Sequence, residues 1–340
     1  MPTIIEQAME AELNDNPKLL SIDRKQVHQD KSVQDMDAEL EQLLAKQRAT
    51  IKVVGCGGGG NNTINRMTEV GIVGVDTIAI NTDAQDLLYT TANKKILIGR
   101  ELTKGLGAGS EPRLGEEAAR EQEAEIKKAL QGCDMVFVTC GLGGGTGTGA
   151  APVVAETAKT LGALVVGVAT TPFSFEGSYR EQVAQKGLDV LKTKVDTMLT
   201  IPNYRVLSQG SKGKSLVEAF WACDEVLRQA VQGITDLILA PGLINVDFAD
   251  IKTIMKNSGS AILGAATAKG EKRAEAAATA ALQSNLLSIS PKGARSVLFN
   301  VSGRDVSLAE IEEIGEIIKK EINPQAKIIF GAVDDPKLKQ

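Results

Sequence analysis

Short apolar segments alternate with helix-like segments from Ile51 onward, and this alternation restricts the fold more than any other feature of the sequence. The apolar segments are rich in β-branched residues and have the length of strands. Strands are predicted at 51–56, 75–83, 93–99, 133–140 and 163–172, and helices at 58–70, 115–132 and 151–162. Strands that alternate with helices indicate βαβ units. The sequence therefore predicts an α/β fold with a Rossmann-like parallel sheet that helices cover on both faces.

The rest of the chain divides into an extension, a central helix and a second domain. Residues 1–49 are polar and contain one short predicted helix at 36–48, which we interpret as a surface helix without a specific partner. A long, largely apolar helix is predicted at 215–239. After Pro241, the pattern is that of a smaller α+β domain, with strands at 260–270, 296–303 and 326–333 and helices at 272–284 and 307–322. The predicted divisions are 1–49, 50–218, 219–241 and 242–340.

The composition excludes several classes of function. Aromatic residues make up 3% of the chain and the net charge is −5, so neither a base-stacking platform nor a large phosphate-backbone footprint is expected. No apolar run is long enough to span a membrane, and the N-terminus lacks the basic start of a secretory signal. The four cysteines form no C-x-x-C pair and are expected to be buried thiols. The one histidine, His28, lies in the extension, which disfavours histidine-based catalysis.

Three glycine-rich segments are candidates for a phosphate-binding loop. "GCGGGG" at 55–60 fits G-x-G-x-x-G between a strand and a helix, and Asp83 lies 23 residues beyond Gly60, so a dinucleotide-dependent oxidoreductase is one hypothesis. "GSKGKS" at 210–215 lacks the spacing of a Walker A loop, and we interpret it as a surface loop. "GLGGGTGTG" at 141–149 follows a strand and precedes a helix, where glycines let the backbone approach phosphate closely.

The first and third of these segments favour a single polyphosphate ligand. Parallel strands end at the same edge of a sheet, so both loops face the same space. Thr146 and Thr148 add hydroxyl donors, and the absence of lysine from 141–149 means that backbone amides and a metal ion must balance the phosphate charge. A turn that serves packing alone needs only one or two glycines, so packing is a weak explanation of this segment. A dinucleotide-dependent enzyme needs only the first loop and would leave the loop at 141–149 unexplained.

The motif "GGGTGTG" resembles the signature of the tubulin/FtsZ superfamily, and further motifs narrow the resemblance to the FtsZ family of prokaryotic cell-division GTPases. Those motifs, in the family's order, are "NTDAQ" (81–85), "GLGAGSEP" (105–112), "PFSFEG" (172–177), "IPN" (201–203) and "INVDFADIKTIM" (244–255). The resemblance covers residues 50–332, and the N-terminal extension resembles archaeal members. It implies a GTPase domain, a long central helix and a smaller α+β domain. It also implies GTP/GDP binding, Mg²⁺ held through the phosphates, and head-to-tail filaments that hydrolyse GTP between subunits in the cytokinetic ring.

The resemblance assigns the nucleotide site residue by residue. The implied nucleotide contacts are Gly58, Gly59, Gly60, Asn61, Asn62, Asn81, Asp83, Ala108, Gly109, Ser110, Gly143, Gly144, Gly145, Thr146, Gly147, Glu176, Arg180, Asn203, Phe220 and Asp224. Asp224 and Asn203 are implied to read guanine, whose N1–H and N2–H₂ donors adenine lacks. Alternatives stay open: Asp224 could be an exposed helix acid, and Phe220 could be a core aromatic. Glu176 and Arg180 are four residues apart and could form an ion pair.

The segment "NVDFAD" at 245–250 is implied to be catalytic. In the family, Asn245, Asp247 and Asp250 would enter the nucleotide site of the adjacent subunit and position the attacking water. The two acids could instead cap a helix, an explanation that suits one acid better than two. A nucleotide-binding structural protein with poor hydrolysis is a third hypothesis, which the presence of all three residues disfavours.

The family also implies partners and a location. The chain is expected to assemble with its own copies in the cytoplasm, at the mid-cell division site, without nucleic acid and without direct membrane insertion. Family members bind membrane adaptor proteins through a flexible C-terminal tail. This chain ends at Gln340, before the family's last strand and tail, so adaptor binding is not expected of it.

Overall fold

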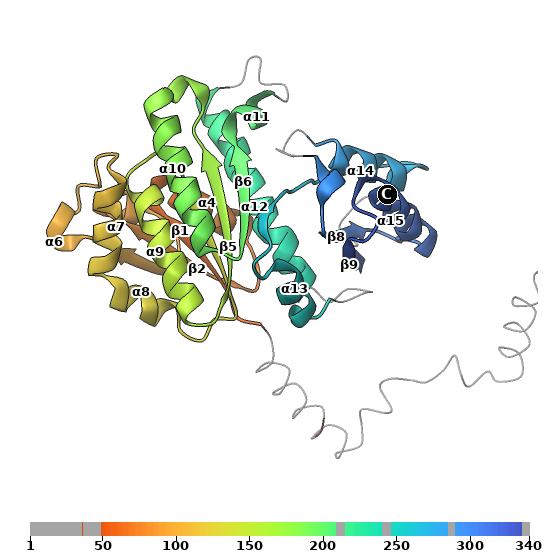
Figure 1. Ribbon diagram of the computed structural model, residues 1–340, viewed down its shortest axis with the longest axis horizontal. Coiled ribbons are helices and arrows are strands. Elements are labelled where there is room, and N and C mark those ends of the chain that lie inside the picture. Colours follow the sequence, from red (N-terminus) through yellow and green to blue (C-terminus); the bar gives the residue numbers. More distant parts are fainter. Residues whose placement is uncertain (1–35, 37–48, 209–214, 240–245, 285–289, 335–340) are drawn as a thin grey trace, which may run out of the picture. The chain divides into compact units, whose positions relative to one another are not determined.

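The computed structural model describes residues 36, 49–208, 215–239, 246–284 and 290–334, and its centre is a seven-stranded sheet (Figure 1). The strand order is β3-β2-β1-β4-β5-β6-β7, and every neighbouring pair is parallel. The chain builds outward from β1 to β3 and then returns to β4 beside β1. This reversal is the point at which doubly wound sheets bind ligands. The predicted α/β class is confirmed.

The strands of this sheet are β1 (Ile51–Cys56), β2 (Val75–Asn81), β3 (Lys94–Leu97), β4 (Met135–Gly141), β5 (Leu164–Thr171), β6 (Thr197–Pro202) and β7 (Gly259–Ala261). The helices that follow them in the same part of the chain are α4 (Gly57–Val70), α5 (Ala84–Tyr89), α6 (Arg100–Thr103), α7 (Pro112–Glu121), α8 (Glu123–Leu130), α9 (Thr146–Thr160), the 3₁₀ turn η2 (Ser174–Glu176), α10 (Ser178–Lys194), α11 (Asn203–Ser208), α12 (Leu216–Leu239) and α13 (Phe248–Met255). The C-terminal part adds α14 (Arg273–Leu282), the 3₁₀ turn η3 (Pro291–Gly293), β8 (Ser296–Gly303), α15 (Leu308–Glu321) and β9 (Lys327–Asp334).

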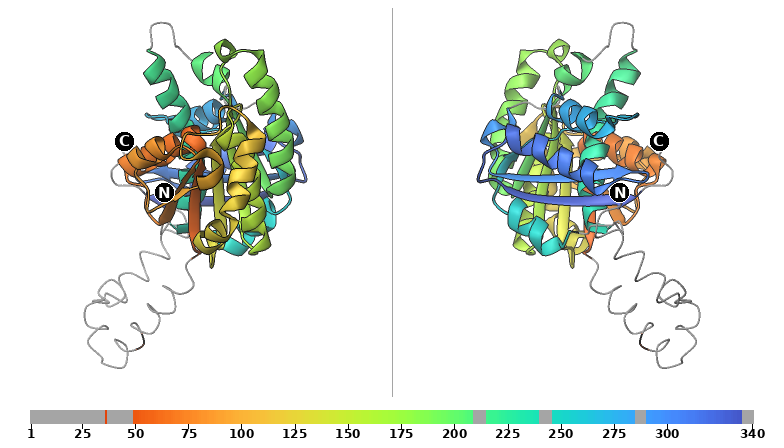
Figure 2. Two further views of the ribbon diagram at one scale, coloured as in Figure 1. Left: turned by 90° about the vertical axis from the view of Figure 1, so that its left-hand side faces the viewer. Right: turned by 90° about the vertical axis from the view of Figure 1, so that its right-hand side faces the viewer.

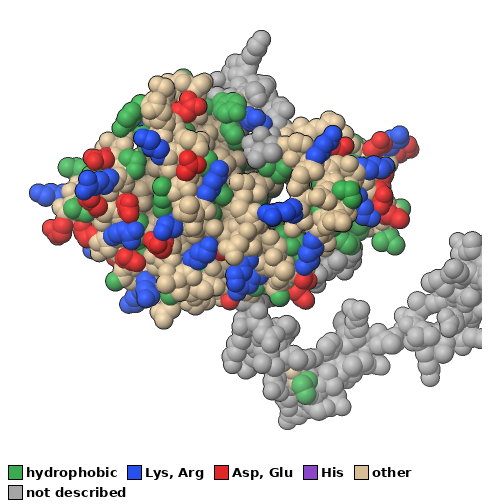
Figure 3. All heavy atoms as spheres, in the orientation of Figure 1, with side chains coloured by type: hydrophobic (Ala, Val, Ile, Leu, Met, Phe, Trp, Pro, Cys, Tyr) green, Lys and Arg blue, Asp and Glu red, His purple; other side chains and the backbone are tan. Residues whose placement is uncertain are grey.

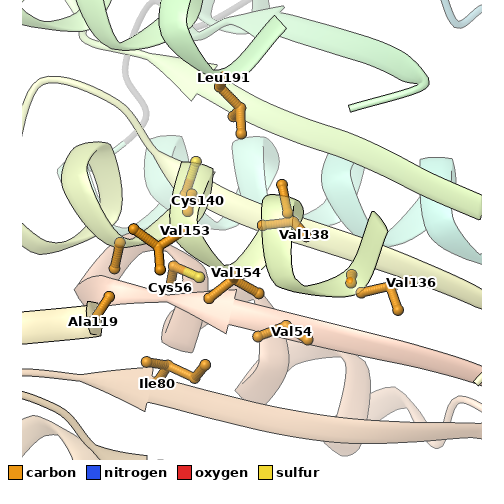
Figure 4. Packing of buried hydrophobic residues seen from close by; sticks show 14 of the residues in the cluster. Val54, Cys56, Ile80, Ala119, Val136, Val138, Cys140, Val153, Val154 and Leu191 are labelled. Atoms are coloured by element: carbon orange, nitrogen blue, oxygen red, sulfur yellow. The ribbon is translucent and has the colours of Figure 1, made fainter. Parts of the chain in front are cut away.

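Alternate residues of the central strands enter two hydrophobic cores, one on each face of the sheet. Val54 and Cys56 of β1 pack with residues of α7, α8, α9 and α10, as Figure 4 shows in part. Ile51 and Val53 of the same strand pack with α4, α12 and α13. Successive side chains of a strand point to opposite faces, so a strand buried on both faces must be apolar throughout. This explains the unbroken apolar runs of the sequence.

Residues 296–334 contain a second, two-stranded parallel sheet, β8 and β9, against which α14 and α15 pack (Figure 2). The helix α15 starts with a capping box, in which Ser307 N donates to Glu310 Oε2 at 2.8 Å and Glu310 N donates to Ser307 Oγ at 3.3 Å. The Arg273 guanidinium and the Ser307 bonds hold the pKa of Glu310 down to about 2. The predicted strands at 296–303 and 326–333 are confirmed.

The strand predicted at 260–270 is wrong in length and in partner. Only β7 is a strand, and it pairs with β6 as the outer strand of the large sheet instead of joining the small domain. Beyond β7, a Cβ on Gly264 would lie 2.3 Å from the carbonyl oxygen of Ala281 in α14, so this segment lies against helix backbone. Glycine and alanine are also poor strand formers.

The helix predicted at 115–132 is two helices, α7 and α8. Gln122 leaves the helical conformation, with φ −103° and ψ 21°, and its side chain accepts a hydrogen bond from Gly99 N.

The structure also contains α10 and β6, which sequence reasoning missed. The predicted helix at 36–48 and the loop at 210–214 lie outside the described residues, apart from Met36. The division of the chain at 218/219 and 241/242 stays a prediction.

Charged side chains of both signs are interspersed on the face of the molecule that Figure 3 shows. Some of these charges form ion pairs, as Arg120 does with Glu116 at 3.1 Å and with Glu156 at 3.5 Å. The four cysteines are free and buried, as predicted. Among the described residues, no helix combines the length and the apolar character needed to cross a membrane.

Candidate nucleotide-binding site

Two glycine-rich turns meet at the carboxyl edge of the large sheet, where β1 leads into α4 and β4 leads into α9. A Cβ on Gly57 would lie 2.6 Å from Gly147 N, and a Cβ on Gly59 would lie 3.1 Å from Gly141 Cα. The two turns therefore pack backbone against backbone, and side chains at these positions would collide. Gly57 also has a φ of 69°, which glycine adopts without steric strain. The turns form one continuous glycine surface, as the sequence predicts.

Both helices that start at this surface begin without a side-chain cap. Neither α4 nor α9 has an acid in its first turn, and within the described part of the chain the N-cap residues, Cys56 and Gly145, make no side-chain cap bond. The helix α5 differs, because Asp83 Oδ1 accepts from Gln85 N at 2.9 Å and from Asp86 N at 3.1 Å. The structure thus gives Asp83, a predicted nucleotide contact, a capping role. Uncapped N–H groups and the positive end of the helix dipole bind anions.

The glycine surface has room for a ligand. Gly58 and Gly59 are exposed, and no atom lies within 4 Å of the position that a Cβ on Gly144 would take. Asn62, the next predicted contact on α4, is exposed as well. Gly60 is instead buried, and a Cβ there would lie 2.6 Å from Thr139 O. Gly60 therefore serves the close packing of α4 on the sheet.

The third predicted loop, Ala108 to Ser110, closes against the second glycine turn. A Cβ on Gly145 would lie 2.9 Å from the Cβ of Ala108 and 2.8 Å from Glu111 N, so only glycine fits at this position. Ala108 is buried, whereas Gly109 is exposed. Ser110 has a φ of 63°, an unusual backbone conformation for a residue other than glycine. The loop therefore has a constrained backbone beside the turn.

Hydroxyl groups brace the second turn from inside. Thr146 Oγ1 lies 2.6 Å from Thr82 Oγ1, which links the start of α9 to the end of β2. Thr148 Oγ1 accepts from Gly143 N at 2.9 Å and is buried, so this hydroxyl closes the turn on itself. The sequence predicts both threonines as phosphate donors, but the structure places Thr148 inside the turn.

Two asparagine side chains converge on one carboxylate beside the first turn. Asn61 Nδ2 and Asn81 Nδ2 donate to the same oxygen of Asp86, at 3.1 Å and 2.6 Å. Both asparagines are predicted site residues, and the structure brings them together. Asp86 is not among the predicted residues. The one signal for it in the sequence is its place on the helix that follows the "NTD" segment.

A largely buried carboxylate reaches this region from α12. Asp224 Oδ1 lies 3.3 Å from the Thr63 hydroxyl, which also lies 3.1 Å from Gly59 O. Burial raises the pKa of Asp224 to about 6, although Thr63 and Arg66 act to lower it. The alternative of an exposed helix acid is therefore wrong. Asn203, at the start of α11, is 7% exposed, and its Oδ1 has no hydrogen-bond partner among the described residues.

Phe173 connects the residues that are predicted at the ribose and the base. Its N–H donates to Glu176 Oε1 at 2.9 Å, and its ring meets the ring of Phe220 edge to face, with 5.2 Å between centroids. Phe220 is 40% exposed, so the alternative of a core aromatic is wrong. Arg180 Nη1 lies 2.5 Å from Glu176 Oε2, and the ion pair expected from the four-residue spacing is present.

The predicted catalytic acids lie at the opposite edge of the sheet. Asp247 and Asp250, at the start of α13, are exposed, and neither side chain has a hydrogen bond or ion pair within the described ranges. The helix ends at Met255, whose carbonyl accepts from the Thr197 hydroxyl at 2.6 Å, at the amino end of β6. A six-residue strand such as β6 spans about 20 Å. One copy thus holds the acids and the glycine surface at opposite ends (Figure 1). Asn245 lies outside the described residues.

Comparison with known proteins identifies the family. A family model described as the GTPase domain of the tubulin/FtsZ family matches residues 50–211, and one described as the FtsZ family C-terminal domain matches residues 259–340. Cell division protein FtsZ 1 of Thermococcus kodakarensis is 52% identical over 304 residues, which cover 89% of this chain and 81% of that protein. The chain belongs to the FtsZ family.

Solved structures of two relatives share the fold. An FtsZ dimer from M. jannaschii has a TM-score of 0.84 at 50% identity, over 89% of each chain. CetZ2 from Haloferax volcanii, described as a GTPγS-bound protofilament, has a TM-score of 0.71 at 25% identity, over 84% of this chain and 90% of that one. As a member of the FtsZ family, the chain is a tubulin-like, filament-forming GTPase of cell division. The predicted resemblance is confirmed, and the oxidoreductase hypothesis is wrong.

Proposed function

We propose that GTP binds with its phosphates on the glycine surface and that its hydrolysis requires the acidic edge of a second copy. The observation that carries the proposal is the separation of the two parts within one chain. The uncapped N-termini of α4 and α9 stand at the carboxyl edge, while Asp247 and Asp250 stand at the amino edge. A head-to-tail neighbour brings these edges together, and a contact of this kind repeats into a filament.

The phosphates would be bound mainly by backbone N–H groups. Gly58 and Gly59 of the first turn are exposed, and the Cβ position of Gly144 in the second turn is open, so a phosphate can approach the backbone closely there. The turns offer amides and hydroxyls instead of a set of carboxylates, which fits a Mg²⁺ ion held largely by phosphate oxygens and water. The Thr82 and Thr146 hydroxyls, which bond each other beside the second turn, would be the side-chain oxygens that help to hold such an ion. When bound, the ion neutralises phosphate charge.

Guanine would be read by Asp224 and Asn203. An ionised carboxylate accepts hydrogen bonds, and guanine presents N1–H and N2–H₂ side by side. Asp224 is largely buried, and its hydrogen-bond partner among the described residues is the Thr63 hydroxyl at 3.3 Å, so a ligand that donates two hydrogen bonds would compensate its burial. Phe220 would stack on the base, and Glu176 with Arg180 would lie at the ribose. Adenine lacks both donors and would leave the carboxylate unpaired.

Hydrolysis in this scheme is an attack of water on the γ-phosphorus. The new bond joins the water oxygen to phosphorus, and the bond from phosphorus to the β–γ bridging oxygen breaks, which yields GDP and inorganic phosphate. Asp247 and Asp250 of the neighbouring copy would hold the water through its hydrogens and accept a proton as the bond forms, with Asn245 assisting. In the cell, the filament would act in the cytoplasm at the mid-cell division site.

The first test is phosphate release from GTP, with Mg²⁺, over a range of protein concentrations. If the site forms between copies, the rate per chain rises steeply above a threshold concentration. A rate per chain that is measurable but independent of concentration would show that each chain holds a whole active site, and it would overturn the proposal.

A mixing experiment separates the two edges more sharply. Asp224→Ala removes the base contact but keeps the acids, whereas Asp250→Ala keeps the nucleotide site but lacks one acid. Each variant alone is expected to be inactive, and a mixture regains activity where the acids of the first meet the nucleotide site of the second. A mixture of Asp247→Ala with Asp250→Ala is the control and stays inactive. If both variants are present in the pelleted filaments and the first mixture still hydrolyses no GTP, the result contradicts a site shared between copies.

A further inference from the structure

Asp86 joins three segments beside the first glycine turn. It lies on α5, and its Oδ2 accepts from Asn61 of α4 at 3.1 Å and from Asn81 at the end of β2 at 2.6 Å. A Cβ on Gly58 would lie 3.8 Å from the same oxygen. The carboxylate is therefore next to the exposed part of the turn while its hydrogen bonds point to two predicted site residues.

Asp86 is itself held in place by its backbone. Its N–H donates to Asp83 Oδ1 at 3.1 Å, and its carbonyl accepts from Thr90 N at 3.1 Å and from Thr90 Oγ1 at 2.9 Å. These bonds secure α5 at its first turn and at its end. The Asp86 side chain thus projects from a fixed helix, so it orients the amides that it contacts.

The two hydrogen bonds determine which way both amides face. A carboxylate only accepts, so each asparagine must turn its NH₂ group toward Asp86 and its Oδ1 away. Asn81 Oδ1 then accepts from Thr82 N at 2.9 Å. Asn61 is 0% exposed, and its Oδ1 has no partner within the described part of the chain. Buried acceptors in native proteins are nearly always paired, so this oxygen points to a missing donor.

We propose that Asp86 is a positioning residue for nucleotide binding, which holds the buried amides of Asn61 and Asn81 in place and so fixes the start of α4 and the end of β2 beside the phosphate turn. The inference rests on the proposed nucleotide site. A turn that is ordered in advance loses less freedom when the ligand binds, and this raises affinity. A negative charge beside a phosphate site by itself lowers affinity for an anion. If Asp86 acts by positioning, its replacement should weaken nucleotide binding. If it acts only by repulsion, its replacement should strengthen nucleotide binding.

The test is a double-mutant cycle on GDP affinity, measured by calorimetry without turnover. Asp86→Ala and Asn61→Ala are each expected to weaken binding about tenfold, the effect of one charge-assisted hydrogen bond. In the double variant, the loss is expected to be smaller than the product of the two single losses, because Asp86 acts through Asn61. The inference would be overturned if Asp86→Ala left GDP affinity unchanged or made binding tighter. It would also be overturned if the loss in the double variant equalled the product of the two single losses.

Two further variants keep the test decisive. Gln85→Ala changes the exposed neighbour on α5 and is expected to leave GDP affinity unchanged. Asp86→Asn keeps one acceptor oxygen and is expected to give a smaller loss than Asp86→Ala, and it replaces that variant if thermal melting shows that Asp86→Ala does not fold. Wild-type protein that fails to bind GDP defeats the proposed function itself. Wild-type binding together with an unaffected Asp86→Ala variant defeats only the role of Asp86.

Discussion

The carboxyl and amino edges of the large sheet differ in how far their polar side chains are already paired. At the carboxyl edge, most candidate side chains have internal partners, as Asn81 has in Asp86 and Thr146 has in Thr82. At the amino edge, Asp247 and Asp250 are exposed and have no side-chain partner among the described residues. Paired side chains keep a fixed geometry, which suits binding. Free carboxylates suit groups that meet their target only when another molecule arrives.

In the proposed function, this difference means that nucleotide affinity depends on one edge of a single chain, whereas GTP hydrolysis depends on two chains. The two turns of the binding edge pack backbone against backbone within one chain, and this packing fixes their geometry for nucleotide binding. The arrangement that hydrolysis needs is absent until two chains meet. Assembly, and not binding, would then start the chemistry, and GTP could remain intact on a single chain.

The largest effect is expected from removal of one exposed acid. Asp250→Ala should lower the rate of GTP hydrolysis per chain about 10²- to 10⁴-fold, the range for loss of a general base. GTP affinity and filament pelleting should persist, because the glycine surface lies at the other edge. Thr253→Ala, an exposed change on the same helix, is the control. Loss of assembly together with turnover would contradict a purely catalytic role for Asp250.

A methyl group within the second turn should damage the binding edge. Gly147→Ala places a Cβ 2.7 Å from Gly141 O and 3.0 Å from Cys56 O, and both are backbone atoms that cannot move alone. We expect a loss of about 1 to 3 kcal/mol in the free energy of unfolding, as for overpacked sites, and a strong loss of GTP affinity.

The matched control for that change lies three residues away. Gly144→Ala meets no atom within 4 Å, so the free energy of unfolding should stay unchanged. Denaturant titration of the two variants checks the contrast. Equal destabilisation would show that the turns are not packed as closely as the structure has them.

A pH titration should reveal the buried carboxylate of the binding edge. The pKa of Asp224 in the folded chain is about 6, above its ordinary value of 3.8, so the folded state binds this proton more tightly than the unfolded state. The nucleotide-free chain should gain roughly 2 to 3 kcal/mol from this group as pH falls from 7 to below 3.8. GTP binding needs the ionised form, so its affinity should fall about tenfold per pH unit below pH 6.

Asp224→Asn isolates this group from all other titrating groups. The difference in unfolding free energy between wild type and the variant should change with pH around 6. A difference that is constant between pH 4 and pH 7 would show that Asp224 is solvated, and that the edge is more open than its burial indicates.

Sequence reasoning located the glycine turns because their signal is local. Each glycine run directly follows an apolar strand, and the parallel sheet follows from the alternation of strands and helices. The guanine-side residues, such as Asn203 and Phe220, came from the resemblance to the FtsZ family, since nothing in their local pattern distinguishes them from surface residues.

Other features depend on contacts between distant parts of the chain. The burial of Asp224 depends on the packing of α12 against α4, which brings it to Thr63, 161 residues away. The role of Asp86 depends on Asn61, which is 25 residues earlier. The short strand β7 exists only as a partner of β6. No periodicity within a segment could predict these features, because each requires the tertiary arrangement.

The smallest effect is expected from thiol labelling, which tests whether the binding edge is formed before nucleotide arrives. Cys56 is the last residue of β1 and Cys140 is the last but one of β4, so both lie next to the glycine turns; they are paired in register, and both are completely buried. Burial raises the pKa of Cys140 to about 12 and raises that of Cys56 as well, so neither supplies a reactive thiolate near neutral pH. Labelling by a maleimide should be slow, with or without GDP. Fast labelling that GDP suppresses would show that the ligand orders this edge. Both edges would then depend on another molecule for their final arrangement, and they would differ only in how much.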